Sequence, residues 1–181
     1  MSIKVAVIGS REPTAEQKRL ARILIQHVLD KGAIVNTGGA DGIDNLAMTM
    51  AQDKCQVYLP WWSYNQEKIP ASAKKVVYSP VTHNKWNKSV NKFHPNPHIL
   101  TRGSRALHAR NFGIIEAADL VIAFPSLKPG GGGTGQGIRI AQYLKKPITI
   151  ITPYGTVRDS DVDALEHFNQ LLTDKESEVN A

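Results

Sequence analysis

Residues 3–13, which read IKVAVIGSREP, decide the fold class of this chain. The segment begins with an apolar run that only Lys4 interrupts, a pattern typical of a parallel strand buried on both faces. A short polar loop that begins with glycine follows it. Thr14 and Gln17 then have the spacing of a capping box, which predicts the start of a helix, and Gly32 stands where that helix would end.

The same order of apolar strand, loop and helix recurs along the chain. Further strands are expected at residues 33–35, 57–59, 120–124 and 148–151, and further helices at 43–50, 106–115, 134–144 and 162–172. Because alternating strands and helices produce parallel sheets with right-handed crossovers, the sequence predicts an α/β fold: a Rossmann-like three-layer sandwich with a mostly parallel, twisted sheet. Residues 1–181 are expected to form one nucleotide-binding domain of this kind.

Residues 61–100 depart from this pattern and are expected to form an irregular basic insertion, in which 75–78 could be a short strand. No Asp or Glu lies between Glu67 and Glu116, whereas lysine, arginine and histidine recur throughout that stretch. The whole chain has a formal net charge of +6, which favours anionic partners.

Cysteine usage and hydropathy indicate the compartment. Cys55 is the only cysteine, which excludes an intrachain disulfide and fits a reducing cytoplasm. No apolar run approaches the roughly 20 residues that cross a bilayer. The first residues also lack the pattern of a secretory signal. We therefore expect a cytoplasmic protein with no membrane partner.

Three glycine-bearing loops follow predicted strands, and each leads into a helix. In a parallel sheet these loops meet beyond the carboxyl ends of the strands, where helix N-termini attract phosphate and glycine lets the backbone come close to it. The predicted phosphate-binding residues are Gly9, Ser10 and Arg11, then Gly38, Gly39 and Asp41, then Gly132, Gly133, Thr134, Gly135 and Gln136 of the glycine run that begins at Gly130. None of the loops has the strict dinucleotide or Walker pattern, which disfavours a dehydrogenase or an ATPase, and no cofactor is predicted.

These motifs resemble those of a known group of proteins. Residues 7–14 (VIGSREPT) and 38–44 (GGADGID) resemble the opening and the second glycine loop of the DprA/Smf DNA-processing proteins. Residues 109–112 (ARNF) resemble the Arg-Asn element of the broader SLOG superfamily, which includes YspA-like and LOG-type proteins. Together with 58–61, 64–65, 94–95 and 132–141, they are similar to a small group of phage-associated SLOG proteins, and the likeness runs from about residue 3 to residue 151.

The resemblance implies a ligand and a set of contacts. The ligand would be a nucleotide or a phosphorylated nucleoside, held by the three loops, with Arg110 and Asn111 facing the same cavity. Members of this superfamily often self-associate, so the resemblance also implies a homo-oligomer. It further implies that the cytoplasm is that of a bacterium or of a phage-infected host cell. The protein would either sense this ligand or hydrolyse its N-glycosidic bond.

Whether the chain is an enzyme stays open. LOG-type phosphoribohydrolases, which resemble this chain in the glycine loop, place a glutamate just after the Gly-Thr pair, whereas Gln136 and Arg139 follow here. Cleavage of an N-glycosidic bond normally needs a carboxylate. Asp41, Asp44 and Glu116 are the weak candidates for that role, although the two aspartates could instead be favoured by a helix dipole.

A second hypothesis concerns single-stranded DNA, which DprA-like proteins bind. Cations neutralise phosphates and aromatic rings stack on bases, and the basic middle of the chain offers both. The candidate residues are Lys85, Trp86, Lys88, Lys92, Arg102 and Arg105. The alternative is a solvated surface whose aromatic rings are buried in the core. No metal site is predicted, because prolines separate His94 from His98 and no carboxylate lies near them.

Overall fold

The computed structural model describes residues 2–128 and 132–181. It contains a six-stranded sheet in the order β4-β3-β2-β1-β5-β6, in which every neighbouring pair is parallel. The strands are β1 (Lys4–Gly9), β2 (Ile34–Thr37), β3 (Cys55–Leu59), β4 (Lys74–Val77), β5 (Leu120–Phe124) and β6 (Ile148–Ile150). The predicted α/β, Rossmann-like fold class is confirmed.

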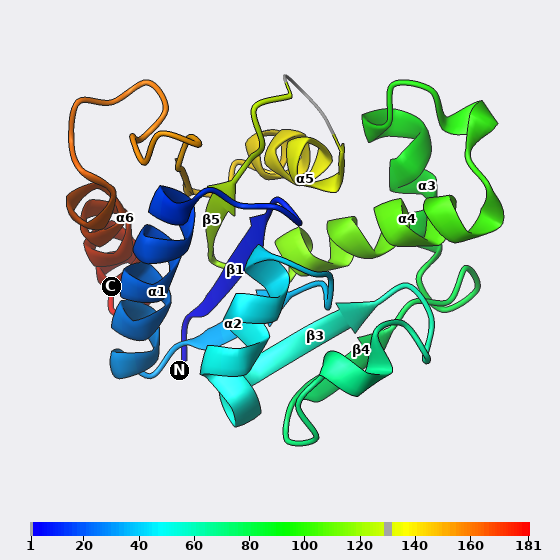
Figure 1. Cartoon of the computed structure of the whole chain (residues 1–181), viewed down its shortest axis with the longest axis horizontal. Coiled ribbons are helices and arrows are strands. Elements are labelled where there is room, and N and C mark those ends of the chain that lie inside the picture. Colours follow the sequence, from blue (N-terminus) through cyan, green and yellow to red (C-terminus); the bar gives the residue numbers. More distant parts are fainter. Residues whose placement is uncertain (1, 129–131) are drawn as a thin grey trace.

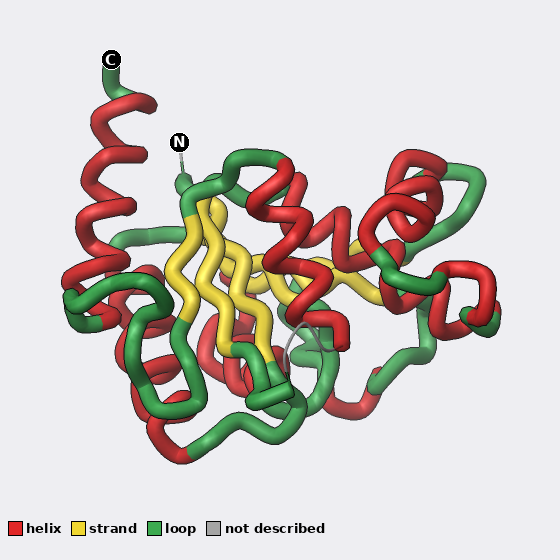
Figure 2. Tube along the Cα trace, turned by 90° about the horizontal axis from the view of Figure 1, so that it is seen from above, coloured by secondary structure: helices red, strands yellow, loops and turns green. Residues whose placement is uncertain are grey.

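Helices cover both faces of the sheet, which gives three layers (Figures 1 and 2). One face carries α1 (Ala15–Asp30), α2 (Ile43–Ala51) and α6 (Ala164–Val179), and the other carries α3 (Asn84–Phe93), α4 (Arg102–Glu116) and α5 (Gly132–Tyr143). Short 3-10 helices occur at Gln52–Lys54, Gln66–Lys68 and Pro97–Ile99. Within the described ranges, none of the helices has the length and apolar character needed to cross a membrane.

The central strands explain why the opening segment decides the fold. Successive residues of β1 contribute alternately to the two hydrophobic clusters: Val5 and Val7 pack with α1 and α2, and Ala6 and Ile8 pack with α4 and α5. All five residues of β5 are likewise fully buried. A strand buried on both faces has no place for alternating polar residues, and the apolar run of β1 reflects this.

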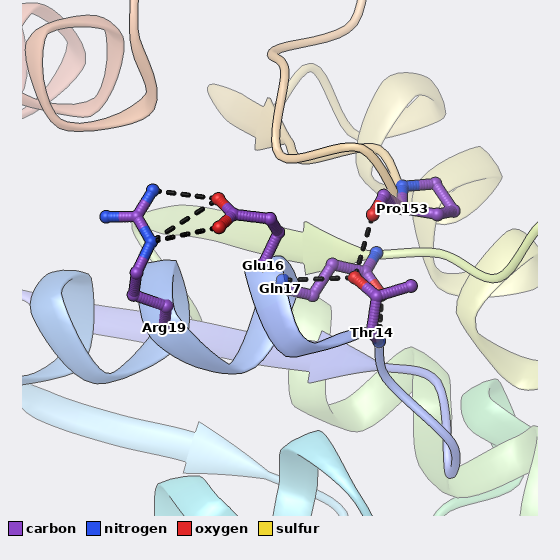
Figure 3. Close-up of polar contacts among 5 residues, drawn as sticks. All are labelled: Thr14, Glu16, Gln17, Arg19 and Pro153. Atoms are coloured by element: carbon purple, nitrogen blue, oxygen red, sulfur yellow. Dashed lines mark hydrogen bonds and ion pairs between the residues drawn. The ribbon is translucent and has the colours of Figure 1, made fainter.

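The start of α1 follows the predicted capping box (Figure 3). Thr14 Oγ1 accepts a hydrogen bond from the amide of Gln17, and the Gln17 side chain accepts one from the amide of Thr14. Gln17 also reaches across the domain, because its Nε2 donates to the carbonyl oxygens of Pro125 and Ile151. The cap of α1 is thus bonded to the segments that follow β5 and β6. Gly32 adopts the left-handed conformation expected at the end of the helix.

The segment 61–100 is more regular than expected. It contains β4, close to the optional strand, and the ten-residue helix α3, which packs beside α4. Trp86, Val90 and Phe93 form the buried or partly buried side of α3, at spacings of four and three residues. Asparagine, which favours caps and turns over helix interiors, occupies three of its other positions, so the sequence pattern of this helix is weak.

Candidate functional site

A cavity of about 800 Å³ lies at the carboxyl ends of β1 and β5, between the loops and the helices α4 and α5. β1 is the point at which the order of the strands reverses direction, since β2 adjoins it on one side and β5 on the other. Ligands of open α/β sheets bind at this switch point. All three predicted loops contribute residues to the cavity.

The predicted residues divide into two groups. Those that line the cavity are Gly9, Ser10, Arg11, Arg110, Asn111, Gly132, Gly133 and Thr134. Those that do not line it are Gly38, Gly39, Asp41, Gly135 and Gln136. From the second loop and the start of the helix that follows it, Ala40 and Asp44 line the cavity instead. Gly130 and the neighbouring Gly131 lie outside the described residues.

The first two loops lie in direct contact. The amide of Ile43 donates to the carbonyl oxygen of Ser10 over 3.2 Å. Gly42, with φ of +76°, makes this approach possible, because a Cβ there would lie only 2.3 Å from the Ser10 oxygen. A Cβ on Gly9 would similarly lie 2.6 Å from the Ile43 side chain. The glycines therefore bring the two loops together, and the first amide of α2 is already used within the protein.

Arg110 is a buried residue that organises the second loop. Its Nη1 donates to the carbonyl oxygens of Gly38 and of Tyr58, the latter over 3.1 Å, and its Nε donates to Oδ1 of Asn111 over 2.9 Å. Only 5% of the residue is exposed. The Arg-Asn pair predicted to face the cavity does so, but the guanidinium already holds two backbone carbonyls.

Asp44 lies beside Arg110 at the start of α2. A Cβ on Gly38 would lie 2.9 Å from Asp44 Oδ2 and 3.0 Å from the Arg110 guanidinium carbon, so Gly38 packs between the two charged groups. Burial raises the pKa of the Asp44 carboxyl, and the positive charge of Arg110 opposes that change. Burial in turn lowers the pKa of Arg110, and Asp44 opposes it. These groups support the loop from inside.

The first turn of α5 forms the third side of the cavity. Gly132, Gly133 and Thr134 line it, and the first amides of an α-helix have no partner within the helix. A Cβ on Gly133 would lie 3.0 Å from Asn111 Nδ2, which shows how closely α5 approaches α4. Arg11 and Lys128, both exposed at the edge, are the nearest cations that also line the cavity.

A hydrogen-bond network joins α4 and α5. Asn111 Nδ2 donates to Gln136 Oε1 over 3.1 Å, and His108 Nδ1 lies 2.5 Å from the same oxygen. Gln136 is fully buried, whereas His108 lines the cavity. His108 was not predicted, although its position three residues before Asn111 places both on one face of α4. Glu12, Leu107 and Lys128 are further lining residues that the sequence analysis missed.

The carboxylates proposed for catalysis are distributed over the molecule. Asp41 is exposed and pairs with Lys68 over 2.6 Å, and Glu116 pairs with Lys85 over 2.5 Å at the far end of α4. The two carboxylates that line the cavity are the buried Asp44 and the exposed Glu12. No group of three or more metal-ligating side chains occurs among residues 2–128 and 132–181.

Most nucleic-acid candidates already have partners within the protein. Trp86 is buried and stacks on His83, with ring centroids 3.9 Å apart, so it belongs to the core rather than to a surface for bases. Lys85 pairs with Glu116, Arg105 donates to the Asn87 side chain and carbonyl, and Lys92 lies over the Tyr143 ring. Lys88 and Arg102 are exposed.

Comparison with known proteins agrees with this architecture. Residues 1–59 match the family model of the DNA recombination-mediator protein A, and no curated protein matches the chain. The segment matched contains β1, α1, β2, α2 and β3 and therefore the first two loops of the cavity.

Solved structures extend the likeness to the whole fold. DNA processing protein A from Helicobacter pylori, described by its single-stranded DNA binding mode, has a TM-score of 0.64 and 21% identity, with 98% of this chain and 80% of that chain covered. The molybdenum cofactor carrier protein from Chlamydomonas reinhardtii has a TM-score of 0.59 and 18% identity, with 95% and 99% covered. The molybdenum cofactor binding protein from Rippkaea orientalis has 0.57 and 19%, with 97% and 86% covered. The chain thus shares the Rossmann-like fold of these solved structures.

Proposed function

We propose that the cavity binds a nucleotide or another phosphorylated nucleoside. One observation carries the proposal: the three loops and α4 enclose a single cavity at the switch point of a parallel sheet, with the first turn of α5 on one side. The phosphate would lie at the amides of Gly133 and Thr134, near Arg11 and Lys128, because a helix N-terminus and cations both stabilise a dianion.

The rest of the cavity suits the nucleoside. Leu107 and Leu127, with the edge of the nearly buried Ile8, provide apolar surface against which a base can pack. A volume of about 800 Å³ falls in the ordinary range for small-molecule sites, which is roughly 300–1,000 Å³. The cavity therefore has room for one nucleotide, with a polar end and an apolar end.

Binding, rather than hydrolysis, is the function that these residues support best. An N-glycosidase needs a carboxylate at the sugar, and Asp44 is held inside the protein beside Arg110. Glu12 is the other carboxylate of the lining, and it is exposed at the edge of the cavity. Hydrolysis would therefore have to use Glu12 as its carboxylate. A protein that senses or carries the ligand needs no carboxylate at the sugar.

Thermal unfolding with free mononucleotides tests this proposal. AMP, GMP, CMP and UMP are each added over a range of concentrations, and a ligand at about 100 times its dissociation constant is expected to stabilise the protein by about 2.7 kcal/mol. Gly133→Asp, which places a carboxylate at the proposed phosphate site, should abolish the shift. Failure of every mononucleotide to raise the melting temperature at millimolar concentration would overturn the proposal.

A second candidate function is the binding of single-stranded DNA. The Helicobacter pylori protein with this fold is described by that activity, and Lys88, Arg102 and the half-exposed Trp62 offer cations and a ring to a strand. In this case affinity for an oligo-dT strand should fall steeply between 50 and 200 mM salt, as expected when several phosphates release counterions. Mononucleotides would then have little effect, which separates the two functions.

A further inference from the structure

The network around Gln136 fixes the protonation pattern of a histidine that lines the cavity. Arg110 fixes the orientation of the Asn111 side-chain amide, because a guanidinium can only donate hydrogen bonds. Its Nε lies 2.9 Å from one end of the Asn111 amide, so that end must be the oxygen. The other end of the amide, which lies 3.1 Å from Gln136, is then Nδ2, a donor.

The hydrogen bonds of Gln136 in turn fix the position of the hydrogen on the His108 imidazole. Since Asn111 Nδ2 donates, the atom of Gln136 that it meets must be the acceptor Oε1. The same oxygen lies 2.5 Å from His108 Nδ1, which therefore has to carry a hydrogen. Reversing the Gln136 amide would set its NH₂ group against the Asn111 NH₂ group, so the network allows one arrangement. In that arrangement the Gln136 Nε2 is buried without a partner among the described residues.

The surroundings of His108 oppose a second proton on the ring. His94 at the end of α3 lies close to it, with ring centroids 4.6 Å apart, and Arg110 of α4 and Arg139 of α5 are the other charged groups that act on it. Each of these disfavours a further positive charge. Burial is the largest cause and lowers the pKa of His108; the hydrogen bond with Gln136 opposes this, but the pKa stays below its ordinary value. A neutral ring with hydrogen on Nδ1 leaves Nε2 as a bare lone pair, and Nε2 has no hydrogen-bond partner in the described part of the chain.

We propose that His108 Nε2 is a neutral hydrogen-bond acceptor of the cavity, and that it selects ligands that present an O–H or N–H donor to it. This inference rests on the proposed nucleotide function and deepens it. The lining has other acceptors, but Asp44 is buried beside Arg110 and already accepts from the Ala40 amide, and Glu12 is exposed at the edge. His108 Nε2 differs from both carboxylates because it is an uncharged acceptor. A nucleoside carries such donors on the ribose and on the base, so one neutral imidazole adds selectivity for that half of the ligand.

The tautomer is measured directly, without a ligand, in long-range ¹H–¹⁵N spectra of protein labelled in histidine. At pH 7, His108 is expected to show hydrogen on Nδ1 and none on Nε2, and Gln136→Leu should release it toward the mixture that an unconstrained imidazole shows. His98, which is exposed, is the internal reference for that mixture. A His108 signal with hydrogen on Nε2, or with both nitrogens protonated at pH 7, would overturn the inference.

Ligand selection is tested with AMP as the probe. His108→Leu is expected to weaken AMP binding about threefold to tenfold, the range for one lost neutral hydrogen bond, while His98→Leu leaves it unchanged. His108→Leu should leave the affinity for inorganic phosphate unchanged, because phosphate reaches only the α5 end. Equal loss for both probes, or no loss for AMP, contradicts the role of Nε2. Absence of AMP binding in the wild type counts against the proposed function, while the tautomer spectrum still decides the state of His108.

Discussion

At the scale of single residues, the two arginines predicted for the site have different tasks. Arg110 is buried and holds the carbonyl oxygens of Gly38 and Tyr58, whereas Arg11 is exposed at the edge of the cavity. The residue type alone could not distinguish these two roles, because both arginines lie in motifs that were predicted to face the same cavity. The separation depends on burial, which the tertiary packing of α4 over β2 and β3 decides.

This difference predicts opposite effects for two alanine substitutions. Arg110→Ala removes three hydrogen bonds and leaves Asp44 buried without its neighbouring cation, so it should lower the free energy of unfolding by about 3 kcal/mol. Arg11→Ala should leave stability within about 0.5 kcal/mol but weaken AMP binding by about 1–3 kcal/mol. Urea unfolding and titration calorimetry measure the two quantities. Equal stability of both variants would show that Arg110 does not support the loop.

Gln17 has polar contacts with two segments that are distant in the sequence. It is 1% exposed, completes the cap of α1, and donates to the carbonyl oxygens of Pro125 and Ile151 (Figure 3 shows the cap). Gln17→Leu should therefore cost about 2–3 kcal/mol, because it leaves buried carbonyls without a donor. Gln26→Leu, at an exposed position of the same helix whose side chain bonds only Asp30, is the control and should change stability by less than about 0.5 kcal/mol. Similar urea midpoints for the two variants would refute this assignment.

At the scale of elements, sequence patterns predicted the strands and helices around β1 well and the segment 61–100 poorly. Apolar runs of the central strands are explicit in the sequence because those strands are buried on both faces. The apolar pattern of helix α3 consists of Trp86, Val90 and Phe93 alone. Prolines on both sides of this segment suggested irregular structure. The stack of Trp86 on His83 that stabilises it depends on neighbours that local sequence does not indicate.

The packing of α3 on α4 predicts a reversal of helix propensity. Replacing glycine with alanine inside a helix normally stabilises a protein by up to about 1 kcal/mol. At Gly113, however, a Cβ would lie 2.4 Å from the Trp86 ring, so Gly113→Ala should displace α3 and destabilise the protein by about 1–3 kcal/mol. Gly103 of the same helix has only ordinary contacts with Trp61, at 3.6 Å, and Gly103→Ala should be neutral or stabilising. Thermal unfolding of the pair measures the sign, and a stabilised Gly113→Ala would contradict the packing argument.

At the scale of the whole molecule, topology predicted where the cavity lies, but it did not predict which side chains line it. Alternation of strands and helices predicts that loops after β1, β2 and β5 meet at one edge, and they line one cavity. Which side chains of α4 complete that cavity depends on how the helix is rotated over the sheet. The rotation of α4 places Leu107 and His108 in the lining, and that of α5 places Gln136 in the core. The spacing of glycines in the sequence carries no information about how a helix is rotated.

Hydrogen exchange with mass spectrometry extends these arguments to the entire chain. A mononucleotide should slow exchange in residues 8–12, 40–44, 107–115, 126–128 and 132–137, which are the segments around the cavity, because bound ligand suppresses local opening. The edge strand β4 and the terminal helix α6 have no residue in the lining and serve as internal controls. A DNA strand would instead protect exposed parts of residues 61–105, where Trp62, Lys88 and Arg102 lie. Protection by AMP that appears at β4 or α6 but not around the cavity would place the nucleotide elsewhere.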